Sequence, residues 1–164
     1  MGKQETDDVM RKVKDWLTDE GIYKDKVPDD NANYHFIVEY PQNSGRITEI
    51  IQPKQRDDLI LIASGTELSK EHYDGLKTKR KEERDKILWD IRFDLLFRNT
   101  DFKTTPEEEF QKIEFFRSLY FDGLTKIMLM DAIRENYKCY LYIVWKMRRL
   151  FGESPLQSQE TMYG

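Results

Sequence analysis

The side chains best suited to acid–base or nucleophilic chemistry are two histidines and one cysteine. His35 and His72 would have to meet in space to form a catalytic or metal-binding pair, and nothing in the sequence places them together. Cys139 lies in the middle of a predicted helix among apolar and aromatic neighbours, where nothing lowers the pKa of a thiol. We therefore expect Cys139 to pack as a small apolar residue and each histidine to have a structural or surface role.

Carboxylates occur at several turn-like positions, namely Asp29-Asp30, Asp57-Asp58 and Asp122. Adjacent residues in a strand point to opposite faces, so neighbouring carboxylates there could not act on one atom. In loops such pairs are usually solvated. Asp122 precedes a predicted helix, where capping or fixing the turn is its expected role. If the protein instead has a pocket between a sheet and a helix, we expect His35, Arg117 and Asp122 to supply its polar groups.

The sequence lacks the motifs that hold phosphates, metals or activated nucleophiles. It contains no GxGxxG, GxxxxGK[ST], HExxH, GxSxG or CxxC pattern. A single cysteine excludes an intramolecular disulfide framework and a multi-cysteine zinc site. With 27 basic and 31 acidic residues, the net charge of −4 argues against nucleic acid as the main partner. We expect no cofactor and no metal, and a non-enzymatic function is favoured.

Length and composition indicate one folded unit. The 164 residues are 38% hydrophobic and 13% aromatic, which predicts a packed core under a surface rich in charge. We expect a single α+β domain over residues 1–152 and a flexible C-terminal tail over residues 153–164, which are mostly polar. The polar start lacks the apolar core of a secretory signal, and no stretch reaches the ~18–20 apolar residues of a membrane span. These features predict a cytoplasmic protein without a membrane partner.

The first half of the chain predicts a helix followed by an antiparallel meander. Thr6 or Asp7 can cap the helix, and Gly21 can end it. From Tyr34 the apolar residues recur at every second position, because Tyr34, Phe36 and Val38 alternate with their neighbours. This spacing is typical of a strand with one buried face. The three strands of this meander are expected at residues 34–40, 46–52 and 59–63.

The second half predicts helices around two further strands. Residues 70–98 have a helical pattern with a break near Gly75 to Thr78. Further elements are expected as a short strand near Phe102, a strand over residues 111–121 and a last helix over residues 126–151. Residues 105–112 fit a helix, a strand or a loop. We predict an α+β fold, an antiparallel sheet of four to five strands with helices packed on it, in the order α-β-β-β-α-β-β-α.

Four segments of the chain resemble those of an uncharacterised archaeal family of unknown function. They are Tyr120–Lys126 before the last helix, the His35-Phe36 strand, the Gln52–Lys54 turn and the Asp57–Ile60 strand. The resemblance covers roughly residues 7–151 and implies a secretion-chaperone-like α+β fold, which has the predicted element order. Chaperones of that fold are typically dimers that bind extended protein segments. The resemblance implies no catalytic residues, and a function taken from it is fold-level analogy.

The last predicted helix is apolar almost all round, which is typical of a helix buried on more than one side. Its second side could meet another helix of the chain, a second subunit or a partner. We favour a protein-binding or adaptor module, chaperone-like and homodimeric, with Tyr140, Trp145 and Met147 as partner-binding residues. A protein segment would dock on an apolar helix–sheet surface or add to a strand edge. The alternatives are a small-ligand binder or enzyme, and a structural subunit of a larger complex.

Overall fold

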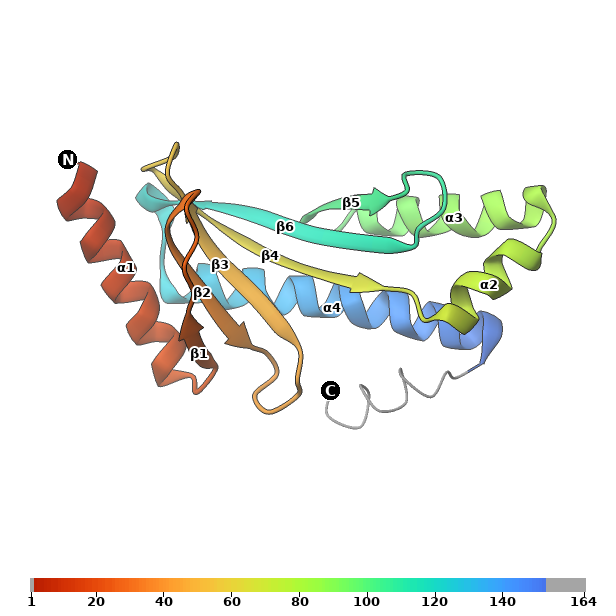
Figure 1. The fold of residues 1–164 in the computed structure, drawn as a ribbon, viewed down its shortest axis with the longest axis horizontal. Coiled ribbons are helices and arrows are strands. Elements are labelled where there is room, and N and C mark those ends of the chain that lie inside the picture. Colours follow the sequence, from red (N-terminus) through yellow and green to blue (C-terminus); the bar gives the residue numbers. More distant parts are fainter. Residues whose placement is uncertain (1, 153–164) are drawn as a thin grey trace.

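In the computed structural model, which describes residues 2–152, these residues form four α-helices and six β-strands (Figure 1). The helices are α1 (Gly2–Asp19), α2 (Lys70–Thr78), α3 (Lys81–Leu96) and α4 (Lys126–Phe151), with the short 3-10 helix η1 (Phe121–Gly123) before α4. The strands are β1 (Tyr23–Lys26), β2 (Ala32–Glu39), β3 (Ile47–Pro53), β4 (Leu59–Glu67), β5 (Asp101–Thr105) and β6 (Lys112–Tyr120). The proposed tail over residues 153–164 lies outside the described residues.

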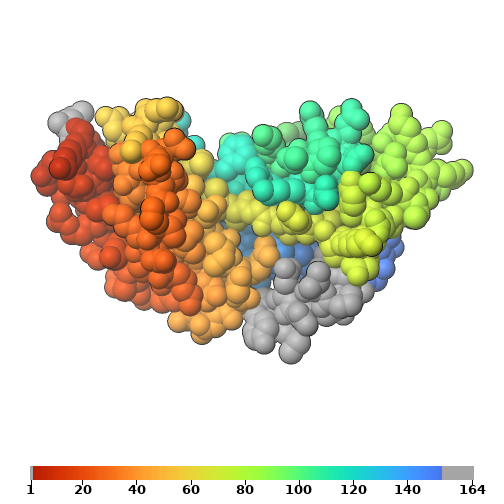
Figure 2. Space-filling model, viewed as in Figure 1, coloured from red at the N-terminus to blue at the C-terminus, as the bar shows by residue number. Residues whose placement is uncertain are grey.

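All six strands join one antiparallel sheet in the order β1-β2-β3-β4-β6-β5. The long helix α4 runs behind the sheet along β4 and β6, and α1 packs beside β1 (Figure 1). In the space-filling view, the N-terminal strands and the β5–β6 hairpin form two lobes separated by a notch (Figure 2). The fold is therefore α+β, as predicted.

The predicted number of four to five strands is wrong, because the sheet has six among the described residues. The additional strand is β1, in which Lys24, Asp25 and Lys26 are all exposed. An edge strand with this composition has no apolar alternation, so its sequence does not predict a strand. The strands predicted at residues 34–40, 46–52, 59–63 and 111–121 are confirmed as β2, β3, β4 and β6.

The helix boundaries differ from the prediction at two places. The first helix begins at Gly2 rather than at Thr6 or Asp7. The long helical segment breaks at Lys79 and Arg80, after α2 has ended at Thr78. Gly75 lies within α2 and does not end it. Its lack of a side chain leaves room for the Phe151 ring of α4. A Cβ atom on Gly75 would lie 2.8 Å from a ring carbon of Phe151.

Buried apolar residues form two separate clusters. The N-terminal cluster joins α1 and β2–β4 to the first half of α4 through Val13, Leu17, Phe36, Ile60 and Ile133, among others. The C-terminal cluster joins α2, α3 and β6 to the second half of α4 through Leu76, Ile91, Phe115, Ile143 and Met147, among others. Helix α4 therefore belongs to both clusters.

A buried polar residue separates the two clusters along α4. Asn136 is completely buried, and its Nδ2 atom donates to the carbonyl of Ile62 at 3.3 Å. Its Oδ1 atom accepts from the Thr100 hydroxyl at 2.7 Å. Both functional ends of the amide are therefore satisfied, which burial of a polar side chain requires. These bonds fix the rotation of α4 against β4 and the β5 side of the sheet.

The ends of α4 are fixed by specific caps. The Thr125 hydroxyl accepts from the backbone N–H of Met128 at 3.2 Å, as an N-cap residue does. At the other end, Gly152 has a φ of +83°, which favours glycine. The carbonyl of Gly152 lies 2.6 Å from Nε2 of His72 on α2. His72 is buried and thus has the structural role expected of it.

Candidate functional site

The outer side of α3 carries a row of exposed apolar side chains. We call this row the α3 stripe; it consists of Trp89, Phe93, Leu96 and Phe97, whose exposed fractions run from 53% to 85%. The opposite side of the helix buries Leu88, Ile91 and Leu95 in the C-terminal cluster. The centroids of the Trp89 and Phe93 rings are 5.7 Å apart, so the two aromatic residues pack against each other at the surface. Helix α3 is therefore apolar on two sides but covered on one.

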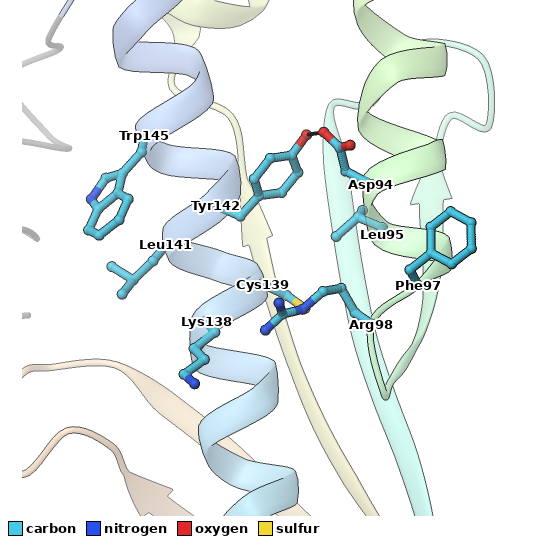
Figure 3. A pocket seen from close by; sticks show the side chains of 9 residues that line it. All are labelled: Asp94, Leu95, Phe97, Arg98, Lys138, Cys139, Leu141, Tyr142 and Trp145. Carbon is cyan, nitrogen blue, oxygen red and sulfur yellow. Dashed lines mark hydrogen bonds between the residues drawn. The ribbon is translucent and has the colours of Figure 1, made fainter.

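A groove of about 800 Å³ lies between α3 and α4, beside the stripe (Figure 3). Its lining is predominantly apolar and includes Leu95, Cys139 and Leu141, with Phe97 and Trp145 on opposite walls. Trp145 is 59% exposed. The polar residues at this α3–α4 groove are Asp94, Arg98 and Lys138. Phe97 belongs to both the α3 stripe and the groove lining, so the two apolar features adjoin at that residue.

Polar contacts hold the two walls of the groove at a fixed spacing. The Tyr142 hydroxyl on α4 donates to the Asp94 carboxylate on α3 (Figure 3). Burial and this neighbouring carboxylate raise the pKa of Tyr142, so the phenol stays protonated at neutral pH. At the other end, the Arg98 guanidinium pairs with Glu135 at 2.6 Å. The groove is therefore braced by contacts between its own walls.

The thiol in the groove is not an activated nucleophile. Cys139 is buried, and burial raises its pKa to about 11. The protonated thiol is consequently the form present at neutral pH. This agrees with the expectation that Cys139 packs as a small apolar residue.

The three residues expected to bind a partner from α4 do not share one surface. Tyr140 and Met147 are buried, whereas Trp145 is exposed at the α3–α4 groove. Residues seven apart lie on the same side of a helix, and for Tyr140 and Met147 this side faces the protein interior. Arg46 also covers Tyr140, with its guanidinium carbon 3.5 Å from the ring centroid. The placement of Tyr140 and Met147 is thus corrected, and a partner contact at Trp145 stays a prediction.

The polar residues expected to line a pocket do not converge. His35 lies on the side of β2 opposite the buried Tyr34 and Phe36. Arg117 pairs in register with the buried Ile62, on the other side of the sheet from His35. Asp122 is exposed in η1. The three side chains therefore come from different faces of the fold, and none of them lines the α3–α4 groove.

His35 instead connects the turn before β2 to β3. Its Nδ1 atom lies 3.0 Å from Asp29, and its Nε2 atom lies 3.0 Å from Glu49. A backbone hydrogen bond from Asn31 and the contact with His35 hold the pKa of Asp29 below its usual value. Within residues 2–152, no group of three His, Cys, Asp or Glu side chains is placed to hold a metal ion. The contacts of His35 with Asp29 and Glu49 therefore link two segments at the surface of the sheet.

The α3 stripe is the part of the surface that sequence reasoning missed. Trp89, Phe93 and Phe97 are apolar residues within the predicted helix over residues 70–98, and apolar character alone does not separate an exposed side from a buried one. Their spacing of four residues, on the side opposite Leu88 and Ile91, is the signal that separates the two sides. The sheet edges offer less to a partner, because β1 and β5 have four and five residues and carry charged side chains.

Comparisons with known proteins identify a family and a related structure. A model of an uncharacterised conserved protein family, DUF2299, matches residues 9–147. The crystal structure of an uncharacterised protein from Methanothermobacter thermautotrophicus is similar, with a TM-score of 0.82 and 35% sequence identity. That match covers 87% of this chain and 99% of the other. No curated protein matches. None of the helices within residues 2–152 combines the length and apolar character needed to cross a membrane.

Proposed function

The chain belongs to the uncharacterised conserved family DUF2299, and we propose that it is a non-enzymatic protein-binding module that acts as a homodimer. The observation that carries this proposal is the α3 stripe beside the α3–α4 groove. Exposed aromatic side chains in contiguous patches are typical of interaction surfaces, whereas single exposed apolar residues are not. A second copy of the chain is the proposed occupant of this surface.

The size of the patch supports a contact between subunits. At roughly 150–250 Å² per aromatic side chain, exposures of 53–85% in the four aromatic residues Trp89, Phe93, Phe97 and Trp145 leave on the order of 500 Å² uncovered. A standard interface buries about 800 Å² on each partner. The patch therefore supplies more than half of the surface that each subunit of a stable dimer needs.

The charges around the groove suit a two-fold contact. Asp94 lies on the α3 wall and Lys138 on the α4 wall, and both are exposed. In a symmetric dimer each surface patch meets its own copy, so a carboxylate on one subunit can face an ammonium group on the other. A patch that carries both signs of charge can be complementary to itself.

The secretion-chaperone-like part of the proposal is an analogy of fold. The order of one helix, a strand meander, a helical pair, two strands and a long helix supports it. Such a module would bind an extended protein segment. Because the edge strands are short and charged, the apolar helical surface suits a partner better than strand addition does.

A small-ligand binder is the second candidate. The groove volume of about 800 Å³ falls within the usual range of ligand pockets, about 300–1,000 Å³. The cation Arg98 at the groove is already paired with Glu135, so it is engaged without a ligand. A dimer would also cover the exposed Trp89 and Phe93, which a ligand in the groove would leave in water.

The molar mass of the full chain in solution tests the dimer. We expect light scattering after size-exclusion chromatography to give twice the chain mass, and Trp89→Ser with Phe93→Ser to give a monomer. The control is Ile127→Ser with Met128→Ser, which removes exposed apolar residues at the far end of α4 and should leave the mass unchanged. A wild-type monomer at high micromolar concentration, or a dimer that survives the α3 substitutions, would overturn the proposal.

A further inference from the structure

Two basic segments that lie far apart in the sequence meet at one end of the molecule. The first, residues 77–81 at the junction of α2 and α3, contains four cations and no acid; the second, residues 146–149 near the end of α4, contains three cations and no acid. We call this surface the basic end, and its members are Lys77, Lys79, Arg80, Lys81, Lys146, Arg148 and Arg149. Figure 1 shows α2 beside the C-terminal end of α4.

Contacts between α2 and α4 bring the two segments together. The ring of Phe151 packs over Gly75, and the Nζ atom of Lys79 lies 5.5 Å from the centroid of that ring. The His72 side chain contacts the carbonyl of Gly152. The basic end is therefore a product of the fold, because the two segments are separated by α3, β5 and β6 in the chain.

Helix capping explains part of this charge but not all of it. Cations in the last turn of α4, such as Arg148 and Arg149, face the negative end of the helix dipole and are favoured there. Arg80 and Lys81 stand at the start of α3, where the dipole disfavours cations. The side chain of Arg80 also makes no capping hydrogen bond. Arg80 does form an i,i+3 ion pair with Glu83 in the first turn of α3, so Lys81 is the cation that local helix stability leaves unexplained.

Acidic neighbours neutralise the basic end incompletely. Glu83 pairs with Arg80 at 2.7 Å, and Lys77 lies over the ring of Tyr73, where Glu109 and Asp74 also act on its charge. Within the described part of the chain, Lys81, Lys146 and Arg149 have no carboxylate at ion-pair distance.

Charge also divides between the two parts of the chain. Residues 1–67 carry 14 acidic and nine basic residues, whereas residues 68–152 carry 15 acidic and 18 basic ones. Residues 68–152 therefore carry a net positive charge, although the net charge of the whole sequence is −4.

We propose that the basic end binds an acidic segment of a protein partner. This rests on the proposed function, in that it gives the protein-binding module a partner of defined charge. A short acidic segment touches the cations alone, while a long polyanion would also meet the negative remainder of the molecule. Exposed Leu150 lies among the cations and can contact apolar residues of such a segment.

Binding of a fluorescein-labelled oligoglutamate peptide, followed by fluorescence anisotropy in low salt, tests this inference. We expect Lys77→Glu with Lys81→Glu, and separately Lys146→Glu with Arg149→Glu, each to weaken binding roughly tenfold, since each removes and reverses several ion pairs. The control is Lys3→Glu with Lys12→Glu, which makes the same change in net charge on α1 and should leave the affinity within a factor of about two.

Three results would overturn the inference. They are no peptide binding by the wild-type chain, equal losses in the control variant, and tighter binding of a single-stranded oligonucleotide of equal charge. The dimer is tested separately by the molar mass of the same variants. A monomer that still binds oligoglutamate through both segments would refute the dimer and leave the basic end intact.

Discussion

The N-terminal cluster and the C-terminal cluster are built on the same sheet and the same helix, but their covering helices differ. Helix α1 buries Val13 and Leu17 and presents charged residues such as Arg11 and Lys12 to the outside. Helix α3 buries Leu88 and Ile91 and presents Trp89 and Phe93. Both clusters fill their interior with apolar side chains, so a lack of core volume does not explain the α3 stripe. The contrast supports the proposal that the outer side of α3 is a contact surface.

Truncating a phenylalanine in each region should give the largest difference between them. Phe36 is fully buried in the N-terminal cluster, so Phe36→Ala should lower the free energy of unfolding by about 3–5 kcal/mol. Phe93 is more than half exposed, and Phe93→Ala should change it by less than about 0.5 kcal/mol in the free protomer. Urea unfolding at low protein concentration measures both values. Equal losses would show that Phe93 is part of the protomer core and would remove the contrast.

A substitution at Gly75 should disturb the C-terminal cluster with an intermediate effect. The added methyl group of Gly75→Ala would collide with the Phe151 ring, at a cost of about 1–3 kcal/mol in unfolding free energy. Gly123→Ala is the matched control, because a Cβ there meets no atom within 4 Å. Thermal unfolding compares the two variants. Adding Phe151→Leu should recover part of the loss, and the absence of any recovery would argue against the packing of α4 on α2.

The smallest expected effect lies at the surface of the N-terminal region and depends on pH. Because the pKa of Asp29 is lower in the folded state, its carboxylate stabilises the fold above its unfolded pKa, and this contribution is lost as pH falls through the folded pKa. Asp29→Asn should therefore destabilise the protein at pH 7, and the difference from wild type should shrink as the pH falls below the usual pKa of 3.8 and through the folded pKa. The exposed neighbour Asp30 provides the control Asp30→Asn. Unfolding in urea across this pH range measures the difference, and a constant difference would contradict the assignment.

The sequence predicts the elements whose patterns are local. Alternation of Tyr34, Phe36 and Val38 identifies β2, and the apolar setting of Cys139 identifies a core position. The same reasoning fails for β1, because an edge strand needs no apolar side and its charged residues resemble a loop. Strand pairing across β4 and β6, which are separated by two helices and β5, also has no local signal.

The candidate site was only partly predictable for a related reason. A helix with apolar residues on several sides does not reveal which side meets the sheet. Tyr140 and Met147 turn inward, while Trp145 and the α3 stripe turn outward, and this choice depends on where α3 and α4 meet. The two basic segments likewise come together through tertiary contacts at Phe151.

The continuity of α4 limits how this fold can change by insertion or deletion. The helix has 26 residues, corresponding to a length of about 39 Å. One residue inserted near Asn136 would rotate everything beyond it by about 100° and turn Cys139, Ile143 and Met147 away from α3. An insertion of the same size in the Pro41–Gly45 turn would lengthen a surface loop. Insertions and deletions in related chains should therefore accumulate in the turns and be rare in α4. The unbroken helix sets the rotation of the residues that it contributes to one cluster relative to those that it contributes to the other.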